Sequence, residues 1–80
     1  MQLEDTVELM TSSDYRDRFK AEYYQNHIRI MKLKAVIEKI HNGTIEFEPI
    51  CQVELLEAQL NVMKEYQAFL VVRSKLENIF

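Results

Sequence analysis

Apolar residues recur at helical spacing from the start of the chain. Leu3, Val7 and Met10 are separated by four and then three residues, which places them on one stripe of a short amphipathic helix over residues 1–10. Hydroxyl and carboxylate side chains follow at positions 11–14, and such oxygens accept hydrogen bonds from the free N–H groups of a helix N-terminus. The pattern predicts that the short helix stops here and that a longer one begins.

The remainder of the chain contains two long helical segments with one short break. The first is predicted over residues 13–41, because the Asn-Gly pair that follows tolerates the left-handed conformation that ends helices. A connector over 42–51 follows, and its Pro49 suits the entry to a second long helix over 52–79. A short connection between long helices gives an antiparallel hairpin. The predicted fold class is all-α, with the whole chain forming one domain in which a short N-terminal helix precedes an antiparallel helical hairpin.

Both long helices carry apolar residues on two sides. On the first, a set with coiled-coil spacing comprises Phe19, Tyr23, Asn26, Ile30, Leu33, Ile37 and Ile40, and a roughly opposite set comprises Tyr24, Ile28, Met31 and Ala35. On the second, the two sets are Leu56, Leu60, Met63 and Leu70, and Val62, Tyr66, Phe69, Leu76 and Phe80. A helix that is apolar on two sides is buried on two sides. Because about ten N-terminal residues are too few to cover two ~40 Å helices, we expect the second faces to meet other copies in a homo-oligomer, or another protein.

Composition and charge narrow the function. The formal net charge of −3 and the sequence pI of about 5.3 argue against wholesale binding of DNA or RNA backbones. The single cysteine, Cys51, excludes an internal disulfide and a Cys-based zinc site. No apolar run approaches the ~20 residues that span a bilayer, and the N-terminus is acidic where a signal peptide is basic. A soluble cytoplasmic protein with no membrane partner is expected.

The sequence pattern offers no catalytic or metal-binding arrangement. His27 and His41 have no Cys or carboxylate at ligand spacing, so no metal site is expected. No Ser/His/Asp, Cys/His or paired-carboxylate pattern stands out, and a single glycine does not make a Gly-rich phosphate loop. We therefore expect a protein that is not an enzyme and has no cofactor. Asn26, the polar member of the first seam, is interpreted as a register-fixing amide.

Cations stand at two informative positions. Tyr15, Arg16 and Arg18 fall in the first turns of a helix, where the free N–H groups disfavour positive charge. Guanidinium groups bind phosphate bidentately and tyrosine rings stack on bases, so one interpretation is a phosphate-bearing ligand. In the other interpretation the arginines only balance neighbouring acidic residues. Arg73, which interrupts the apolar sets of the second helix, likewise either reaches the rim of the apolar surface or binds a ligand.

The chain resembles a family of small phage proteins with a helical-hairpin domain, the family that includes the anti-CBASS cyclic-oligonucleotide sponges. The resemblance is carried by residues 14–23 (Asp-Tyr-Arg-Asp-Arg-Phe-Lys-Ala-Glu-Tyr) and 55–66 (Leu-Leu-Glu-Ala-Gln-Leu-Asn-Val-Met-Lys-Glu-Tyr), with the spacing of Leu33 and Ile37 between them. It covers roughly residues 13–79.

This resemblance implies both assembly and function. Such proteins form compact oligomers, hexamers in the best-known members. They bind cyclic dinucleotides, and in some cases cyclic trinucleotides, between protomers without cleaving them. A bacterial immune effector in the host cytoplasm is thereby deprived of its second messenger. An interface between copies offers a paired set of cations and rings from one sequence position.

The resemblance also indicates candidate ligand-binding residues. Tyr15, Arg16 and Arg18 match the Tyr-Lys/Arg-x-Arg start of the family's first long helix. The pattern of its second helix, Gln-x-x-x-Met-x-x-Tyr with an arginine seven residues on, is matched by Gln59, Met63, Tyr66 and Arg73. The implied ligand-binding residues are Tyr15, Arg16, Arg18 and Arg73.

The leading hypothesis is therefore a phage immune-evasion protein that sequesters cyclic di- or trinucleotides. One alternative is a helical adaptor that binds a host protein through an apolar helix face. A small RNA-binding hairpin is a further alternative, which the acidic net charge disfavours. A sponge requires cations and aromatic rings that converge between copies, whereas an adaptor requires an apolar surface left open after self-assembly.

Overall fold

The computed structural model describes residues 1–44 and 50–80. Within these ranges the chain forms a 3₁₀ turn η1 (Leu3–Thr6), a short helix α1 (Val7–Met10) and two long helices, α2 (Tyr15–Asn42) and α3 (Val53–Leu76), and it contains no strand. The predicted all-helical fold class is confirmed. Residues 45–49 of the predicted connector, including Pro49, lie outside the described residues.

The ends of α2 are set by two local features. Asp14 is extended, and its side chain accepts a hydrogen bond of 2.9 Å from the backbone N–H of Arg16. The helix therefore begins at Tyr15, two residues later than predicted, because Asp14 rather than Ser or Thr satisfies the free N–H groups of the first turn. At the other end Gly43 has a φ of 67°, the left-handed conformation that glycine adopts without a steric penalty and that ends the helix at Asn42.

Helix α3 ends earlier than predicted. Its last residue is Leu76, whereas the apolar periodicity predicted a helix to residue 79. Asn78 has a φ of 55°, and the backbone N–H of Ile79 donates to the carbonyl of Ser74 (2.9 Å), which is the hydrogen bond that closes a helix end with a left-handed residue. Asparagine tolerates this conformation. The turn sends Ile79 back into the core, where it is 7% exposed.

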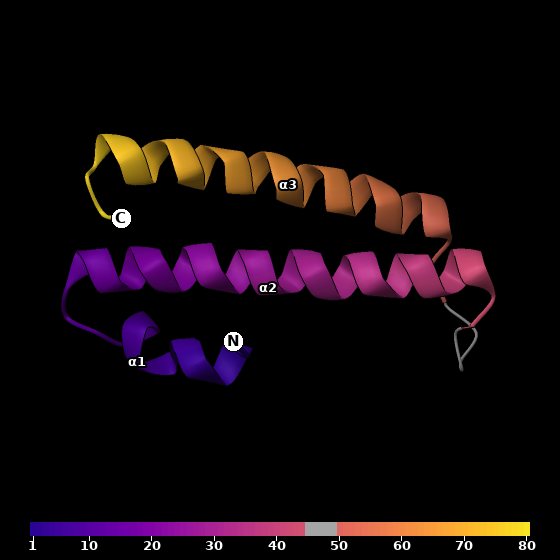
Figure 1. The fold of residues 1–80 in the computed structure, drawn as a ribbon, viewed down its shortest axis with the longest axis horizontal. Helices are drawn as coiled ribbons and strands as arrows, with labels where there is room; N and C mark the ends of the chain where they lie inside the picture. The colour runs from indigo at the N-terminus through magenta and orange to yellow at the C-terminus, as the bar shows by residue number, and fades with distance from the viewer. Residues whose placement is uncertain (45–49) are drawn as a thin grey trace.

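The helices lie side by side in one layer (Figure 1). α3 runs antiparallel along one side of α2, and η1 with α1 packs on the other side, near the start of α2. The molecule measures 43 × 24 × 16 Å. Among the helices that the structure describes, α2 has a neighbour on each side, whereas α3 packs only against α2.

The seam between α2 and α3 contains two apolar clusters. The first comprises Phe19, Leu70 and Ile79, with Tyr23 packed against it. The second comprises Ile30, Ile37 and Leu60, with Leu33, Val53, Leu56 and Met63 packed against it. These residues belong to the seam sets expected from the sequence, apart from Val53 and Ile79, which the periodicity left out.

A pair of amides connects the two helices in the same seam. Asn26 donates from Nδ2 to the Met63 carbonyl (3.1 Å) and to Oε1 of Gln67 (2.8 Å), and Gln67 donates in turn to the Tyr23 carbonyl (3.3 Å). A shift of α3 by one turn would break all three hydrogen bonds. Asn26 is placed as its register-fixing interpretation requires.

The second apolar face of α2 is covered only in part. The N-terminal segment is held on α2 by Thr6, which is fully buried and accepts a hydrogen bond of 2.9 Å from Nε2 of Gln25. Ile28 is buried beneath this segment, but Met31, one turn further on, remains 52% exposed. The short segment therefore covers the first half of this face and leaves the rest open.

The second apolar face of α3 has no neighbour among the other helices of residues 1–44 and 50–80. Leu55, Val62, Phe69 and Leu76 stand at intervals of seven residues and are 60, 64, 69 and 82% exposed. These four residues, with the half-exposed Tyr66 beside them, are here called the outer stripe. None of the helices in residues 1–44 and 50–80 is long and apolar enough to cross a membrane.

Candidate functional site

The start of α2 and the end of α3 lie next to each other because the hairpin is antiparallel (Figure 1). There the hydroxyl of Tyr15 donates to Oε1 of Glu77 (2.6 Å) and accepts from Nη2 of Arg73 (2.9 Å). Arg73 also donates from Nε to Oε2 of Glu77 (3.1 Å). These three residues, together with Arg16, are called the end cluster.

A buried aromatic ring supports the end cluster. The guanidinium carbon of Arg73 lies 5.0 Å from the ring centroid of Phe19, a core residue that is 2% exposed. The ring of Tyr15 is also close to that of Phe19, with centroids 6.3 Å apart. A cation over an aromatic face is attracted by the ring quadrupole. The core residue Phe19 thus helps to position the side chains of both Arg73 and Tyr15.

The hydrogen bonds shift the pKa values of all three connected groups. The bond between Tyr15 and Glu77 has the largest effect on both residues, and it raises the pKa of Tyr15 and lowers the pKa of Glu77. The bond to Glu77 likewise raises the pKa of Arg73. At neutral pH the end cluster therefore holds a neutral tyrosine, an ionised carboxylate and a guanidinium cation.

The structure brings three of the four predicted site residues together. Arg16 donates to the carbonyl of Asn78, the residue after Glu77, so its side chain reaches the same end of α3 as that of Tyr15. Arg18 instead donates from Nη1 to the carbonyl of Ser12 (2.9 Å), on the N-terminal side of the helix. Backbone carbonyls are the partners that these two cations find near the N-terminus of α2, and the carbonyls at the C-terminal end of α3 carry partial negative charge.

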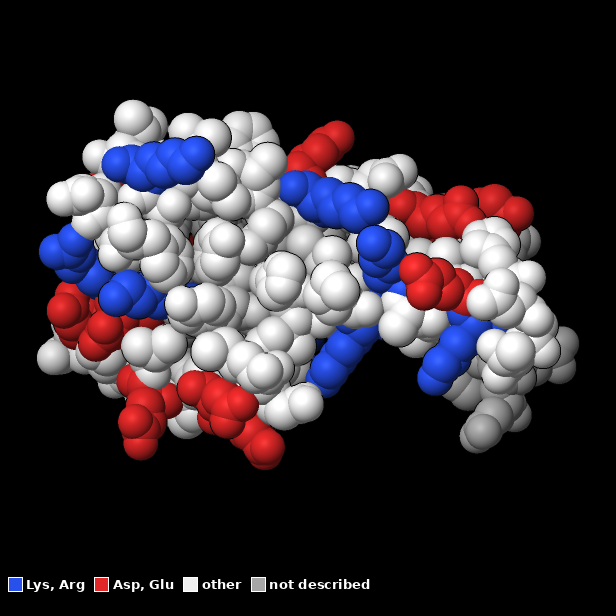
Figure 2. Space-filling model, viewed as in Figure 1, with Lys and Arg blue, Asp and Glu red and all other residues white. Residues whose placement is uncertain are grey.

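Charged groups of both signs lie at this end of the molecule. In the space-filling view, Lys and Arg atoms lie close to Asp and Glu atoms at the end where α2 begins and α3 ends, an area without charged residues follows, and the other half of the molecule again carries charges of both signs (Figure 2). The end cluster is open to solvent, and the side chain of Arg73 is 46% exposed. An oxyanion can therefore reach its donors.

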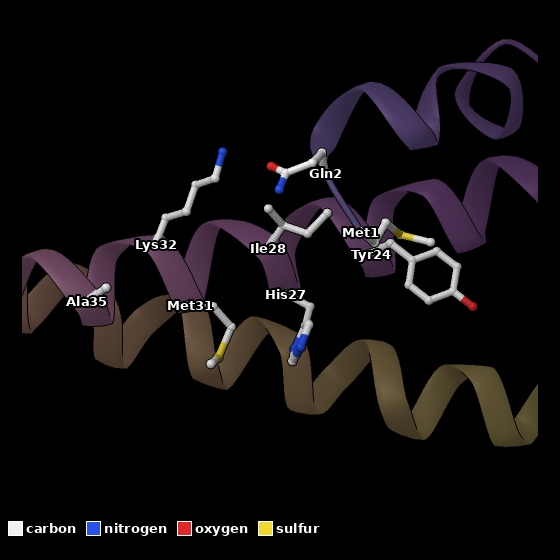
Figure 3. A pocket seen from close by; sticks show the side chains of 8 residues that line it. All are labelled: Met1, Gln2, Tyr24, His27, Ile28, Met31, Lys32 and Ala35. Carbon is white, nitrogen blue, oxygen red and sulfur yellow. The ribbon is translucent and has the colours of Figure 1, made fainter.

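A hollow in the described residues lies elsewhere. It has a volume of about 580 Å³ and lies between the N-terminus and the second apolar face of α2 (Figure 3). Its lining residues are Met1, Gln2, Tyr24, His27, Ile28, Met31, Lys32 and Ala35. None of the predicted site residues is among them. The predicted site is thus a surface cluster that is separate from this hollow.

Sequence reasoning missed Glu77 and Asn78. Glu77 stands four residues after Arg73, which is the spacing of ion pairs on a helix, and this signal could have identified the pair. Its contact with Tyr15, 62 positions away, carried no local signal. The matched residues of the second helix also separate, because Met63 packs against the core while Tyr66 and Arg73 are exposed.

Fold and site together define a small helical-hairpin protein with a hydrogen-bonded cluster of tyrosine, arginine and glutamate on its surface. The chain belongs to the Sequestin family, whose model matches residues 13–76, which is most of the chain. The family name suggests a protein that binds and sequesters a ligand. Comparison with curated proteins and with solved structures finds no match. Tyr15, Arg16, Arg18 and Arg73 all fall inside the matched range.

Proposed function

We propose that the chain sequesters cyclic di- or trinucleotide second messengers and holds them without cleavage. The end cluster is the observation that carries the proposal. It presents the guanidinium group of Arg73 at the hydroxyl of Tyr15 and that of Arg16 at the neighbouring Asn78 carbonyl, in a member of a family whose name suggests sequestration. Guanidinium groups bind phosphate oxygens in pairs, and tyrosine rings stack on bases. Binding of this kind needs no acid, base or nucleophile.

We further propose that a second copy of the chain completes the site. The end cluster is continuous with the outer stripe, because Arg73 lies one turn from both Phe69 and Leu76 on α3. A two-fold contact through the outer stripe, with its axis passing near Arg73, would bring two copies of Arg73 close together. A cyclic dinucleotide carries two phosphates related in the same way. Assembly into a hexamer is the expectation that the family resemblance adds.

The biological role follows from the same resemblance. A phage protein that holds cyclic nucleotides in the bacterial cytoplasm would block CBASS-type defence, since the immune effector acts only after it binds its messenger. Support comes from the similarity of residues 14–23 and 55–66 to anti-CBASS sponges and from the family match over 13–76.

Calorimetry tests this proposal. Cyclic di-AMP, cyclic di-GMP, cyclic GMP-AMP and a cyclic triadenylate should be titrated into the protein, with AMP and a linear dinucleotide as controls. At least one cyclic compound should bind, and at 100 times its dissociation constant it should stabilise the fold by ~2.7 kcal/mol in thermal unfolding. Heat denaturation should then release the compound intact, as chromatography can verify. Absence of binding by every cyclic compound would reject the proposal, and recovery of fragments would indicate an enzyme.

A helical adaptor is the second candidate, and the outer stripe is the observation that favours it. Four large apolar side chains at seven-residue intervals, each at least 60% exposed, form a surface that fits a partner helix. A purified protein that remains monomeric and binds no cyclic nucleotide would favour the adaptor. Self-association that buries Phe69 would leave the adaptor no such surface.

A further inference from the structure

We propose that Glu77 is a built-in competing anion, which occupies the oxyanion position of the end cluster in the free protein and leaves it when a phosphate binds. This inference rests on the proposed function, because it assigns the phosphate of the ligand to the donors that now hold Glu77. It makes Glu77 a residue that sets affinity and selectivity without contacting the bound ligand.

The geometry of the donors supports this assignment. The two carboxylate oxygens of Glu77 have separate partners, since Oε1 accepts from the Tyr15 hydroxyl (2.6 Å) and Oε2 accepts from Nε of Arg73 (3.1 Å). A phosphodiester also presents two free oxygens from one centre. A charged donor and a neutral donor on two different helices thus already hold an anion, and the anion is part of the chain.

The Glu77 side chain is able to leave without unfolding the tail. The turn after α3 is closed by backbone hydrogen bonds, from Ile79 N–H to the Ser74 carbonyl (2.9 Å) and from Glu77 N–H to the Arg73 carbonyl (2.8 Å). Ile79 is anchored in the core with Phe19 and Leu70. Release of the carboxylate therefore requires only side-chain rotation, and this side chain is already 34% exposed.

Competition of this kind discriminates between ligands. A simple anion must displace Glu77 and gains only the same two donors in return, so its net affinity is low. A ligand with two phosphates and two bases makes further contacts with rings and cations, which offset the displacement. Glu77 also follows immediately after the family match, which ends at residue 76, so the competing carboxylate belongs to the tail beyond the matched hairpin.

Inorganic phosphate is the probe that tests the inference, because it reports on the end cluster alone. Titrations should follow the Arg73 Nε–H resonance by NMR in the wild type, in Glu77→Gln and in the control Glu65→Gln. The control removes the same charge from an exposed position of α3. Glu77→Gln should bind phosphate about tenfold more tightly than the wild type, and Glu65→Gln should match the wild type. In the wild-type protein, saturating phosphate should also move the carboxyl carbon resonance of Glu77, a readout that needs no substitution.

The outcomes separate this inference from the proposed function. Equal or weaker phosphate binding by Glu77→Gln, or no phosphate binding by any of the three proteins, would overturn the inference. It would show that Glu77 only holds Tyr15 and Arg73 in place. A different outcome is that no cyclic nucleotide binds but Glu77→Gln still binds phosphate more tightly than the wild type. That outcome would support Glu77 as a competing anion and reject cyclic nucleotides as the ligand.

Discussion

Tyr15 joins the two long helices through a single hydroxyl group. It donates to Glu77 and accepts from Arg73, and the ring beneath both residues belongs to the core residue Phe19. Tyr15, Glu77 and Arg73 therefore orient one another through hydrogen bonds, and the buried ring of Phe19 supports them. Surface hydrogen bonds of this kind add little to stability because water competes for the same groups. Their main consequence is that they position the guanidinium group of Arg73. Substitutions in the end cluster should therefore change ligand affinity more than the free energy of unfolding.

Arg73→Ala should weaken binding of the tightest cyclic nucleotide at least tenfold. A charge-assisted hydrogen bond contributes about 1.5–3 kcal/mol, and about 1.4 kcal/mol corresponds to a factor of ten. The melting temperature without ligand should change little, because the Arg73 side chain is nearly half exposed. Calorimetry on Arg73→Ala and on the control Lys64→Ala, an exposed cation of the same helix, measures the difference. Equal affinity in both variants would move the site away from α3.

Arg18 provides a separate comparison at the same scale. The sequence predicts that Arg18→Ala weakens binding at least tenfold, as a lost charge-assisted hydrogen bond would. In the free chain this guanidinium donates to the Ser12 carbonyl and lies outside the end cluster. The same calorimetry decides whether Arg18 turns toward the ligand. Unchanged affinity would restrict the site to Tyr15, Arg16 and Arg73.

The lowered pKa of Glu77 predicts a pH-dependent stability. The folded state binds this proton less readily than the unfolded state, so the ionised carboxylate stabilises the fold above its ordinary pKa of about 4.5. That contribution is lost as the pH falls through the lower folded pKa. Tyr15 and Arg73, the groups that face Glu77, keep their protons throughout this range because their pKa values are raised. The difference in melting temperature between wild type and Glu77→Gln should be constant from pH 7 to 5 and shrink below about 4.5. A difference that persists to pH 3 would show that the carboxylate charge is not involved.

At the scale of elements, the hairpin combines apolar packing with a polar lock. The apolar clusters favour any pairing that buries Leu60 and Leu70, and heptad-like spacing permits more than one such pairing. The Asn26–Gln67 pair makes its hydrogen bonds in one register only. The amides thus select among arrangements that the apolar residues leave close in energy.

A double-mutant cycle tests this lock. Asn26→Leu should lower the free energy of unfolding by about 1–3 kcal/mol, because it leaves the partly buried amide of Gln67 without its partner. Gln67→Leu should do the same for Asn26. The double variant should be nearly as stable as the wild type, since leucines can pack where both amides were removed together. Urea denaturation of the four proteins gives the coupling energy, which should be about 2 kcal/mol or more because it equals the sum of the two single losses. Simple additivity of the two single effects would contradict the lock.

At the scale of the whole molecule, α3 packs against α2 alone among the helices of residues 1–44 and 50–80. It therefore forms one edge of the arrangement in Figure 1. Contiguous apolar surface on a small protein indicates an interaction site. The outer stripe therefore predicts association of the chain with copies of itself.

Light scattering should give a mass several times 9.6 kDa at micromolar concentration. Phe69→Glu should reduce the mass toward that of one chain, because the interface would have to bury an unpaired charge. Val7→Glu places the same charge on α1, across α2 from the outer stripe, and should leave the mass unchanged. Circular dichroism should show that the variants retain their helices. A wild-type protein that is monomeric, or a mass unaffected by Phe69→Glu, would reject this interface.

The amino-acid sequence by itself determined the helical segments and the seam between them. These segments depend on the spacing of apolar residues, on an aspartate before Tyr15 and on a glycine after Asn42. Each of these signals acts within one or two helical turns, so it can be recognised in the sequence without knowledge of the fold. Asn78 shows the limit of this reasoning, because the apolar residues on both sides continued the helical pattern while the backbone turned.

Tertiary structure alone decided the site and the open surface. Tyr15 and Glu77 are 62 positions apart, and they meet only because α3 pairs with α2 in one register. A shift of one helical turn would move Glu77 by about 5.4 Å, twice the length of a hydrogen bond. In the same way, the sequence marked two apolar faces on each helix, but packing determined which remained exposed. Helix-forming preferences are local, whereas the relative position of two surfaces depends on every contact between them.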